Sequence, residues 1–464
     1  MGGTADSTVI RPYVGDNCFF VDEEVHRMKT IAFKDLDHYL GQTIRIDGFV
    51  SRIRDLKYVQ FMIVRDISGE VQVTLEKNEE NQKWNELVSH LTCESTVKIE
   101  GLLSYNEKVK LRHMELLPTS IEVTSYSEEE LPLQYQDAHS ALLDTRLNYR
   151  FLDLRRQANQ LMFQVQTSLV QGMRDFVLQQ SFIEIHTPKM IGAASESGSE
   201  VFKLQYFDRE AYLAQSPQFY KQMAIAAGFE KVFEIAPAFR AENSNSYRHS
   251  TEFTSFDIEF SYIDSYEEVM DFEEDLLIAG LRRVKEQYGK PIKEVFGVEV
   301  TVPTKPFPRI KLADLYQALK EKYGFEMNYE DVGDMNAQSE KLASQYAMET
   351  YHHPFLFVTD YHASKRAFYH LRKHGVPQGY DLIWKGCEIT TGAQREHRYA
   401  QLCQQASEKG LGEDVKFYLE FFKYGCPPHG GFALGIDRLT MLLLETGSLK
   451  ETMFLFRGPD RIEP

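Results

Sequence analysis

Hydrophobic and polar positions alternate differently in two parts of the chain. Between residues 41 and 123, five short stretches alternate with the two-residue period of a half-buried strand, and one helical stretch at 84–91 interrupts them. Five strands and one helix predict a small β-barrel of the OB type. From Arg150 onward the period changes. Apolar residues between 161 and 176 recur three and four positions apart, which predicts one long amphipathic helix.

Two alternating strands joined by a polar turn stand out in the second part, between Phe233 and Phe260. The first strand places Arg240 and Glu242 on one face. The second strand has an apolar face of Thr254, Phe256, Ile258 and Phe260, and its other face carries Phe253, Ser255, Asp257 and Glu259. We therefore expect a hairpin that packs one face on the core and presents an arginine, an aromatic ring and carboxylates on the other. Such a surface can hold a nucleoside triphosphate beside an amino acid.

The composition narrows the class of protein. The chain has 464 residues, of which 43% are hydrophobic, and this is enough for two globular domains. A formal charge of −17 argues against indiscriminate nucleic-acid binding, so any RNA contact must use a local basic patch. One short stretch with few acids offers such a patch, made of Arg45, Arg52, Arg54, Lys57 and Arg65.

Cysteine usage and hydropathy indicate the compartment. The five cysteines are scattered without paired metal spacing, and an odd number fits a reduced compartment better than a disulfide framework. No apolar run approaches the ~18 residues that a membrane helix needs, and the N-terminus carries no signal pattern. We expect a cytoplasmic protein with no membrane contact.

Six ungapped segments carry a resemblance to a known family: RFLDLRR, FIEIHTPKMI, AYLAQSPQFYKQM, FEIAPAFRAENSNSYRHSTEFTSFDIE, EITTGAQR and PPHGGFALGIDRLTM. The hairpin and the last segment look like motifs 2 and 3 of class II aminoacyl-tRNA synthetases. The surrounding sequence is similar to aspartyl-tRNA synthetases of the archaeal and eukaryotic cytosolic type. The resemblance runs from about residue 40 to the C-terminus.

The resemblance implies an α+β protein with two main domains. An OB-fold anticodon-binding barrel is followed by a catalytic domain whose antiparallel sheet is flanked by helices. Combined with the composition along the chain, it gives an N-terminal extension at 1–38, the barrel at 39–125, an acidic hinge at 126–147 and the catalytic domain at 148–464.

The implied activity is that of an aspartate–tRNA ligase. Such an enzyme activates L-aspartate with ATP to aspartyl-adenylate, uses Mg²⁺ as cofactor, and transfers the aspartyl group to the 3′ end of tRNA(Asp). The family also forms a homodimer through motif 1, which here surrounds Pro188. Taken alone, the amphipathic helix of that motif would indicate only a core helix.

The resemblance also assigns the ATP site. Arg240 and Arg438 would neutralise the triphosphate and are the implied catalytic residues. The other implied ATP contacts are Glu242 near the adenine amino group, Arg248 and His249 at the γ-phosphate, Phe253 stacked on adenine, and Glu388. The implied metal ligands are Glu388, Thr391 and Asp381.

Selection of aspartate requires cations, because aspartate and asparagine differ by a charge on nearly the same shape. Arg395 and Lys221 are the expected pair, with Asp257 holding the lysine. An amide substrate would leave a desolvated cation unpaired. By resemblance, Ser216 and Gln218 face the α-amino group, and Glu196 lies in a loop that closes over the amino acid.

The barrel would read the anticodon. By resemblance, Arg54, Phe61 and Gln72 face unpaired bases, with the ring stacked on the central uracil and the glutamine at its edge. The alternative for Phe61 is an inward position in the barrel core, because alternation with Met62 leaves its face ambiguous.

Three other functions remain to be weighed. Lys221 and Asp257 disfavour an asparaginyl-tRNA synthetase, since similar asparaginyl enzymes do not keep the lysine. An asparagine synthetase on the same catalytic fold would have no use for a barrel that carries Phe61 and Gln72. A catalytically silent RNA-binding relative would tolerate loss of the phosphate arginines, yet Arg240, Arg248, Arg395 and Arg438 are all present.

Overall fold

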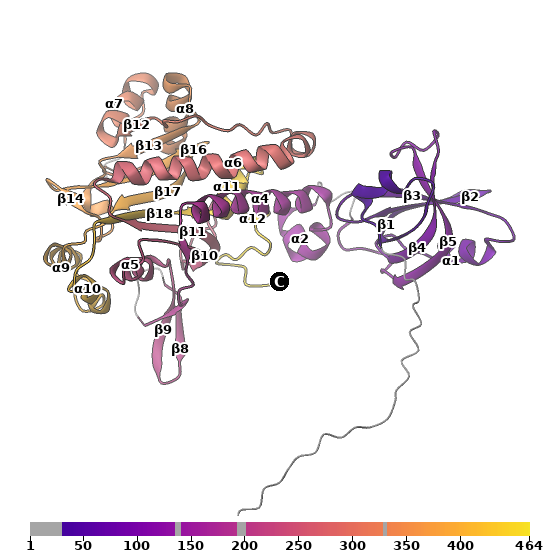
Figure 1. Ribbon diagram of the computed structural model, residues 1–464, viewed down its shortest axis with the longest axis horizontal. Coiled ribbons are helices and arrows are strands. Elements are labelled where there is room, and N and C mark those ends of the chain that lie inside the picture. The colour runs from indigo at the N-terminus through magenta and orange to yellow at the C-terminus, as the bar shows by residue number, and fades with distance from the viewer. Residues whose placement is uncertain (1–29, 135–140, 193–200, 328–331) are drawn as a thin grey trace, which may run out of the picture. The chain divides into compact units, whose positions relative to one another are not determined.

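The computed structural model describes residues 30–134, 141–192, 201–327 and 332–464. The described residues up to Pro132 form one compact unit and those from Leu133 onward form another (Figure 1). Each unit has its own hydrophobic core. Among the described helices, none combines the length and apolar character that a bilayer crossing requires.

The first unit is a closed five-stranded barrel in the order β1-β2-β3-β5-β4, as the alternation predicts. Helix α1 (Gln82–Ser89) lies between the third and fourth strands in the chain. The strands are β1 (Thr43–Asp55), β2 (Val59–Arg65), β3 (Glu70–Glu76), β4 (Thr96–Tyr105) and β5 (Met114–Ser125).

The barrel begins before the predicted boundary at residue 39. The 3-10 helix η1 (Phe33–Tyr39) buries Phe33 and Leu36 completely in the barrel core. The predicted extension at 1–38 therefore overlaps the barrel, and residues 1–29 lie outside the described part. At the other end, helix α2 (Leu143–Asn148) starts within the predicted hinge at 126–147.

An eight-stranded sheet forms the base of the second unit. Its inner strand pairs are antiparallel and the outermost pair at each edge is parallel, so the predicted α+β class is confirmed. In spatial order the strands are β12 (Arg309–Lys311), β13 (Phe355–Thr359), β16 (Gly379–Trp384), β17 (Cys387–Gln394), β18 (His429–Gly435), β11 (Glu252–Ser261), β10 (Lys231–Phe239) and β6 (Ile183–Glu184).

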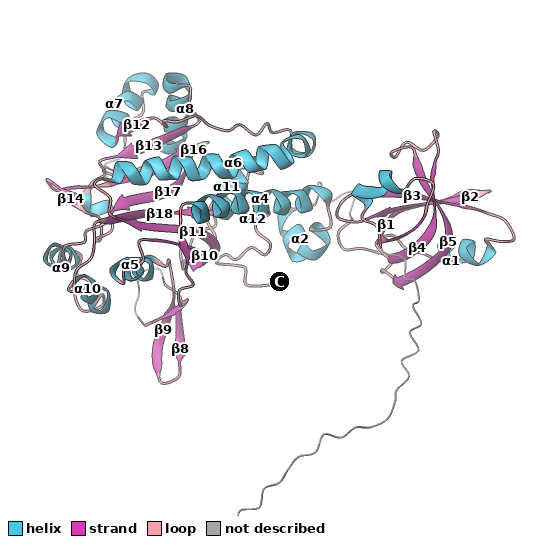
Figure 2. Ribbon diagram, in the orientation of Figure 1, coloured by secondary structure: helices cyan, strands magenta, loops and turns pink. Residues whose placement is uncertain are grey.

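Two smaller sheets accompany the large one. The β8–β9 hairpin projects from the body of the second unit (Figure 2). The small sheets contain β7 (Met190–Ile191), β8 (Lys203–Tyr206) and β9 (Arg209–Leu213), and β14 (Arg372–Lys373) with β15 (Val376–Pro377).

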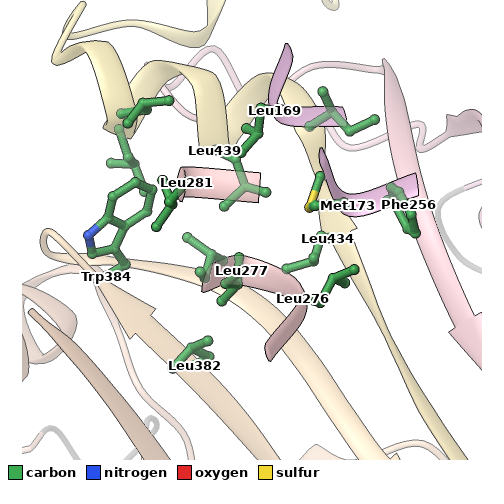
Figure 3. Packing of buried hydrophobic residues seen from close by; sticks show 14 of the residues in the cluster. Leu169, Met173, Phe256, Leu276, Leu277, Leu281, Leu382, Trp384, Leu434 and Leu439 are labelled. Carbon is green, nitrogen blue, oxygen red and sulfur yellow. The ribbon is translucent and has the colours of Figure 1, made fainter. Parts of the chain in front are cut away.

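Helices α4, α6 and α11 cover one face of the large sheet, and α4 and α6 run side by side (Figure 1). Their leucines interlock with side chains of β11, β16 and β18 (Figure 3). The helices of this unit are α2, α3 (Arg150–Asp153), α4 (Gln157–Gln179), α5 (Gln218–Ala226), α6 (Tyr266–Phe296), α7 (Leu312–Tyr323), α8 (Ala337–Tyr351), η3 (Ala363–Lys365), α9 (Tyr399–Glu408), α10 (Lys416–Phe422), α11 (Ile436–Leu444) and α12 (Leu449–Thr452).

The hairpin of β10 and β11 has the two faces that its alternation predicts. Phe256, Ile258 and Phe260 pack into the core below the sheet. Phe253 and Asp257 line a cavity on the opposite face. Because successive side chains of a strand point to opposite sides, alternate residues of β11 pack into the core and the residues between them line the cavity.

Glu273 on α6 is a buried acid whose titration can be tested. It is fully buried and accepts a hydrogen bond from the Tyr380 hydroxyl at 2.7 Å. Burial raises the pKa of Glu273 from its usual 4.5 to about 8. Between these two values the unfolded chain has released a proton that the folded chain retains, so this group's contribution to stability falls as the pH rises through that window.

We expect Glu273→Gln to remove this pH dependence. The amide keeps an acceptor for Tyr380 and has no proton to lose. Urea unfolding at pH 5 and pH 8 should show the variant gaining stability relative to the wild type at the higher pH. A stability difference that does not change with pH would contradict a raised pKa at this position, because the other titrating groups cancel in the comparison.

Candidate active site

A cavity of about 300 Å³ opens on the face of the sheet opposite α4 and α6. Strands β11, β17 and β18 form its floor, and α5 and the residues after η3 form its walls. It gathers nearly all the described residues that the sequence predicts for the catalytic unit: Ser216, Gln218, Lys221, Arg240, Glu242, Arg248, His249, Phe253, Asp257, Glu388, Thr391, Arg395 and Arg438. Asp381 is buried next to this set, and Glu196 lies outside the described residues.

One end of the cavity contains two buried cations and two buried carboxylates. The Lys221 ammonium lies 3.2 Å from Asp257 Oδ1 and 3.3 Å from Glu259 Oε2. Arg395 places Nε 2.9 Å from Glu259 Oε1 and Nη2 3.2 Å from Glu259 Oε2. Burial opposes ionisation of Glu259, but Arg395 and Lys221 outweigh it and hold the pKa of this carboxyl below its usual value. Asp257 holds Lys221 as expected, and Glu259 joins both cations.

Close packing around Glu259 requires a glycine. A Cβ on Gly431 of β18 would lie 2.5 Å from Glu259 Oε2 and 2.0 Å from the carbonyl oxygen of Ile258. The Gly431 carbonyl also accepts from Arg395 Nη2 at 2.8 Å. Thus β18 both leaves room for the carboxylate and orients the guanidinium.

The other end of the cavity is open and cationic. Arg240 follows the last residue of β10, and its guanidinium lies 5.2 Å from the centre of the Phe253 ring. Its side chain is 45% exposed and its nearest carboxylate oxygen, on Glu242, is 4.0 Å away. Arg240 is therefore held loosely and can turn toward an anion.

Arg438 occupies the first turn of α11 and links two neighbouring segments. Its Nη1 donates to the carbonyl of Glu388 at 2.8 Å, and its Nη2 donates to the carbonyl of Arg248 at 3.2 Å. A cation at a helix N-terminus faces the positive end of the helix dipole, which is unfavourable unless carbonyls or an anion compensate. The two carbonyls hold this guanidinium at the cavity wall.

Arg248 and His249 lie in the turn of the hairpin as predicted. Arg248 Nη1 is 2.5 Å from Glu340 Oε2, and this oxygen also accepts from the backbone N–H of Glu388 at 2.9 Å. Glu340 belongs to α8 and is 3% exposed. Burial lowers the pKa of His249, and the nearby arginines add to this effect despite Glu242. The imidazole is therefore neutral near pH 7.

Three predicted anticodon residues share the outer surface of the barrel. Arg54 of β1 pairs with Phe61 of β2, and Ile63 of β2 pairs with Gln72 of β3. Phe61 is half-buried whereas Met62 is 1% exposed, so the ring faces outward and the inward alternative is wrong. The three side chains thus lie on adjacent rows of one surface, the arrangement that base stacking requires.

The predicted basic patch is smaller than expected. Arg65 is 4% exposed and forms a buried pair with Glu94, with 2.6 Å between Nη2 and Oε2. Arg45 is paired with Asp47 at 3.1 Å. Arg52, Arg54 and Lys57 remain exposed. The predicted patch is wrong at Arg65 because this last residue of β2 turns inward and pairs with Glu94, an acid 29 residues away in sequence.

Comparison with known proteins agrees with this geometry. Residues 142–457 match the family model of class II tRNA synthetases (D, K and N), and residues 44–124 match that of the OB-fold nucleic acid binding domain. The chain belongs to the class II tRNA synthetases. It contains both the catalytic and the anticodon-binding modules of that family.

The relatives of this synthetase cover nearly its whole length. An aspartate–tRNA(Asp/Asn) ligase of Aeropyrum pernix is 40% identical over 92% of this chain and 96% of its own. An aspartate–tRNA(Asp) ligase of Pyrococcus abyssi is 39% identical over 91% of this chain and 97% of its own.

Solved structures of two specificities have the same fold. The aspartyl-tRNA synthetase from Entamoeba histolytica superposes with a TM-score of 0.83 at 29% identity, covering 98% of this chain and 96% of its own. The asparaginyl-tRNA synthetase from Pyrococcus horikoshii in complex with asparaginyl-adenylate superposes with a TM-score of 0.85 at 28% identity, covering 94% of this chain and 100% of its own. Fold similarity alone therefore does not decide the amino acid.

The acids of this synthetase allow a test of the predicted metal site. The Thr391 hydroxyl is 2.9 Å from Asp381 Oδ1 and 3.0 Å from Glu388 Oε1. Arg366 bonds both oxygens of Asp381, at 2.8 and 2.5 Å. Burial raises the pKa of Glu388 to about 7, and Asp381 adds to the shift. A nearby cation would favour the ionised form of Glu388.

These contacts fit a magnesium ion held mainly by the nucleotide. No group of three or more His, Cys, Asp or Glu side chains in the described ranges could hold a metal by itself. Mg²⁺ usually takes one or two carboxylates and keeps water and phosphate oxygens as its other ligands. Glu388 and Thr391 line the cavity and suit this role, whereas Arg366 already occupies Asp381.

Sequence reasoning assigned no role to three residues of the site. Glu259 contacts both Lys221 and Arg395, Glu340 pairs with Arg248, and Arg366 pairs with Asp381. The spacing of Glu259, two residues after Asp257 on the polar face of one strand, is a signal that could have identified it. Glu340 and Arg366 come from distant segments with no recognisable pattern, so only the tertiary structure brings them to the site.

Proposed function

We propose that this class II synthetase is an aspartate–tRNA ligase, which activates L-aspartate with ATP and esterifies tRNA(Asp). The observation that carries the proposal is the buried pair of cations, Lys221 and Arg395, at the closed end of the cavity. The names of its relatives support the same substrate.

The donors at that end suit a carboxylate better than an amide. Arg395 donates from Nε and Nη2 to Glu259 and to the Gly431 carbonyl, while its Nη1 donates no hydrogen bond to any of the described residues. Lys221 supplies a second positive charge, while its N–H groups already face Asp257, Glu259 and the carbonyl oxygens of Ile258 and Phe432. A carboxylate offers an acceptor to Arg395 Nη1 and a negative charge to both cations, whereas an amide is neutral and can turn its N–H groups toward them. Aspartate is therefore favoured over asparagine.

The chemistry needs no nucleophilic side chain. The α-carboxylate of aspartate attacks the α-phosphorus of ATP, a new O–P bond forms, and the bond to the β-phosphate oxygen breaks to release pyrophosphate. Arg240 and Arg438 neutralise charge on the phosphates, and Phe253 offers a face to adenine. A bound Mg²⁺ would add positive charge at the phosphates beside Glu388. A hydroxyl of the terminal adenosine of tRNA then attacks the aspartyl carbonyl and releases AMP.

We also propose a homodimer through motif 1. Pro188 lies between Ile183 and Met190, two apolar side chains that are 49% and 57% exposed in the single chain. Strand β6, which contains Ile183, is an edge strand of the large sheet. A second copy covering this edge would remove both side chains from water.

The direct test is charging of purified tRNA pools with labelled aspartate and asparagine. The proposal requires aspartate to be attached to tRNA(Asp) with a clear preference over asparagine. Attachment of asparagine alone would overturn it. Because two relatives are named for both tRNA(Asp) and tRNA(Asn), the assay should also compare these two tRNAs as acceptors of aspartate.

Phe61→Ala and Gln72→Ala should separate tRNA recognition from amino-acid activation. Each substitution removes a base contact worth ~1–3 kcal/mol, so aminoacylation should fall by roughly 5- to 150-fold. Pyrophosphate exchange should stay near the wild-type rate because the barrel takes no part in adenylate formation. Leu102→Ala, at an exposed position of β4, serves as the matched control. Equal loss in both assays would mean that Phe61 and Gln72 are structural.

A further inference from the structure

A chain of buried hydrogen bonds lies behind Gln218. The side-chain nitrogen of Gln218, Nε2, donates to Gln222 Oε1 at 2.9 Å, and the Tyr418 hydroxyl donates to the same oxygen at 2.9 Å. The Gln222 amide nitrogen is 2.9 Å from His429 Nε2, and His429 Nδ1 is 2.8 Å from the carbonyl oxygen of Pro427. Gln222 and His429 are each 0% exposed.

The direction of every bond in this chain follows from its last member. The Pro427 carbonyl can only accept, so His429 Nδ1 must carry the proton that it donates. The other nitrogen of a neutral ring, Nε2, then accepts, and the group that faces it must be the NH₂ of Gln222. The Gln222 oxygen consequently points away from His429 and must receive the NH₂ of Gln218.

The neutral state of His429 is supported by its surroundings. Burial lowers the pKa of the imidazole to about 4, although Glu259 and the Pro427 carbonyl act in the opposite direction. Only one nitrogen therefore carries a proton, and the contact with Pro427 determines which one.

Only one orientation of the Gln218 amide is compatible with this chain. With its NH₂ committed to Gln222, the Gln218 oxygen is left without a donor from the described residues, and Gln218 lines the cavity. A carbonyl oxygen beside the amino-acid end is an acceptor for an ammonium group. An amide rotated by 180° would present N–H groups there and repel a cation.

We propose that His429, acting through Gln222, fixes the Gln218 amide so that its oxygen accepts a hydrogen bond from the α-ammonium group of the bound amino acid. Gln222 and His429 are positioning residues, since neither lines the cavity. The inference rests on the proposed function only in that the substrate is an α-amino acid. It holds equally for aspartate and asparagine, which share this group.

The experiment compares a substrate with an analogue that lacks the amino group. Aspartate KM and the inhibition constant of succinate, which keeps both carboxylates, are measured by pyrophosphate exchange in wild type and in His429→Leu. Losing the orientation should raise the aspartate KM by about tenfold or more, because a hydrogen bond to a charged group is involved. The succinate constant and the KM for ATP should change by less than about threefold, since neither ligand places an ammonium group at Gln218.

Two further variants keep the outcome decisive. Tyr418→Phe removes a buried hydrogen bond to the same Gln222 oxygen but leaves the orientation of the Gln222 amide set by His429. It should therefore change the ratio of the aspartate KM to the succinate inhibition constant much less than His429→Leu does. Gln222→Met removes the middle of the chain and replaces His429→Leu if that variant does not fold. Equal weakening of aspartate and succinate, or an equal effect of Tyr418→Phe on their ratio, would overturn the proposal.

Failure of the proposed function would be recognised separately. A wild-type enzyme that exchanges with asparagine instead of aspartate contradicts the proposed substrate, and the comparison is then made with asparagine and succinamate. The effect of His429→Leu on the ratio of the substrate KM to the inhibition constant of the deaminated analogue would still decide whether this series of hydrogen bonds orients Gln218.

Discussion

Arg240→Ala should lower aspartate-dependent pyrophosphate exchange by about 100-fold or more. The guanidinium stands at the open end of the cavity, where we propose that the ATP phosphates bind and that charge moves from the α-phosphate to the departing pyrophosphate. Among the described residues, its guanidinium contacts the Phe253 ring as a cation–π pair and approaches Glu242 to 4.0 Å, with no further side-chain partner. Its removal should therefore reduce the rate of adenylate formation without unfolding the protein.

Arg240 is a better position than Arg438 for testing the contribution of a positive charge to adenylate formation. Arg438 bonds two backbone carbonyls, so its loss would disturb the cavity wall as well as the charge. Arg282→Ala on the exposed side of α6 is a suitable control, since it removes the same group away from the cavity. Unchanged exchange in a folded Arg240→Ala protein would remove Arg240 from the mechanism.

Local periodicity was sufficient to predict the hairpin that forms the site. A two-residue period assigns Phe256 to the core and Asp257 to the cavity without knowledge of any partner strand. The same rule predicts the five barrel strands. It cannot say which way Phe61 faces, because an aromatic ring suits either side of a barrel wall, and the neighbouring strands decide this.

Pairings between distant segments could not be predicted from patterns. Arg65 pairs with Glu94, 29 residues further along the chain, and Arg248 pairs with Glu340 of α8, 92 residues further along the chain. A charged side chain in sequence is usually solvated, so burial with a partner is visible only after folding. As a consequence, Arg248, which the motif predicts to bind phosphate, is held by an acid of α8, a helix that lies outside the motifs.

Lys221→Met should raise the aspartate KM by about 100-fold or more and narrow the preference over asparagine. The ammonium is 2% exposed and holds Asp257 and Glu259 at 3.2 and 3.3 Å, so its loss leaves two buried carboxylates partly uncompensated. Breaking a buried pair in this way costs about 3–5 kcal/mol, and here the added repulsion falls on the aspartate side chain. Asparagine carries no charge at that position and should suffer less, while the KM for ATP should change little.

Lys189→Met provides the matched control for this substitution. Lys189 also compensates a buried acid, since its ammonium lies 2.9 Å from Glu234, but neither residue lines the cavity. Loss of thermal stability is expected in both variants, whereas a changed ratio of kcat/KM for aspartate over asparagine is expected only in Lys221→Met. The two variants together separate the cost of an unpaired buried carboxylate from the loss of a substrate contact. If Lys221→Met keeps the wild-type ratio, Arg395 alone distinguishes the carboxylate from the amide and Lys221 serves only to hold Asp257 and Glu259 in the fold.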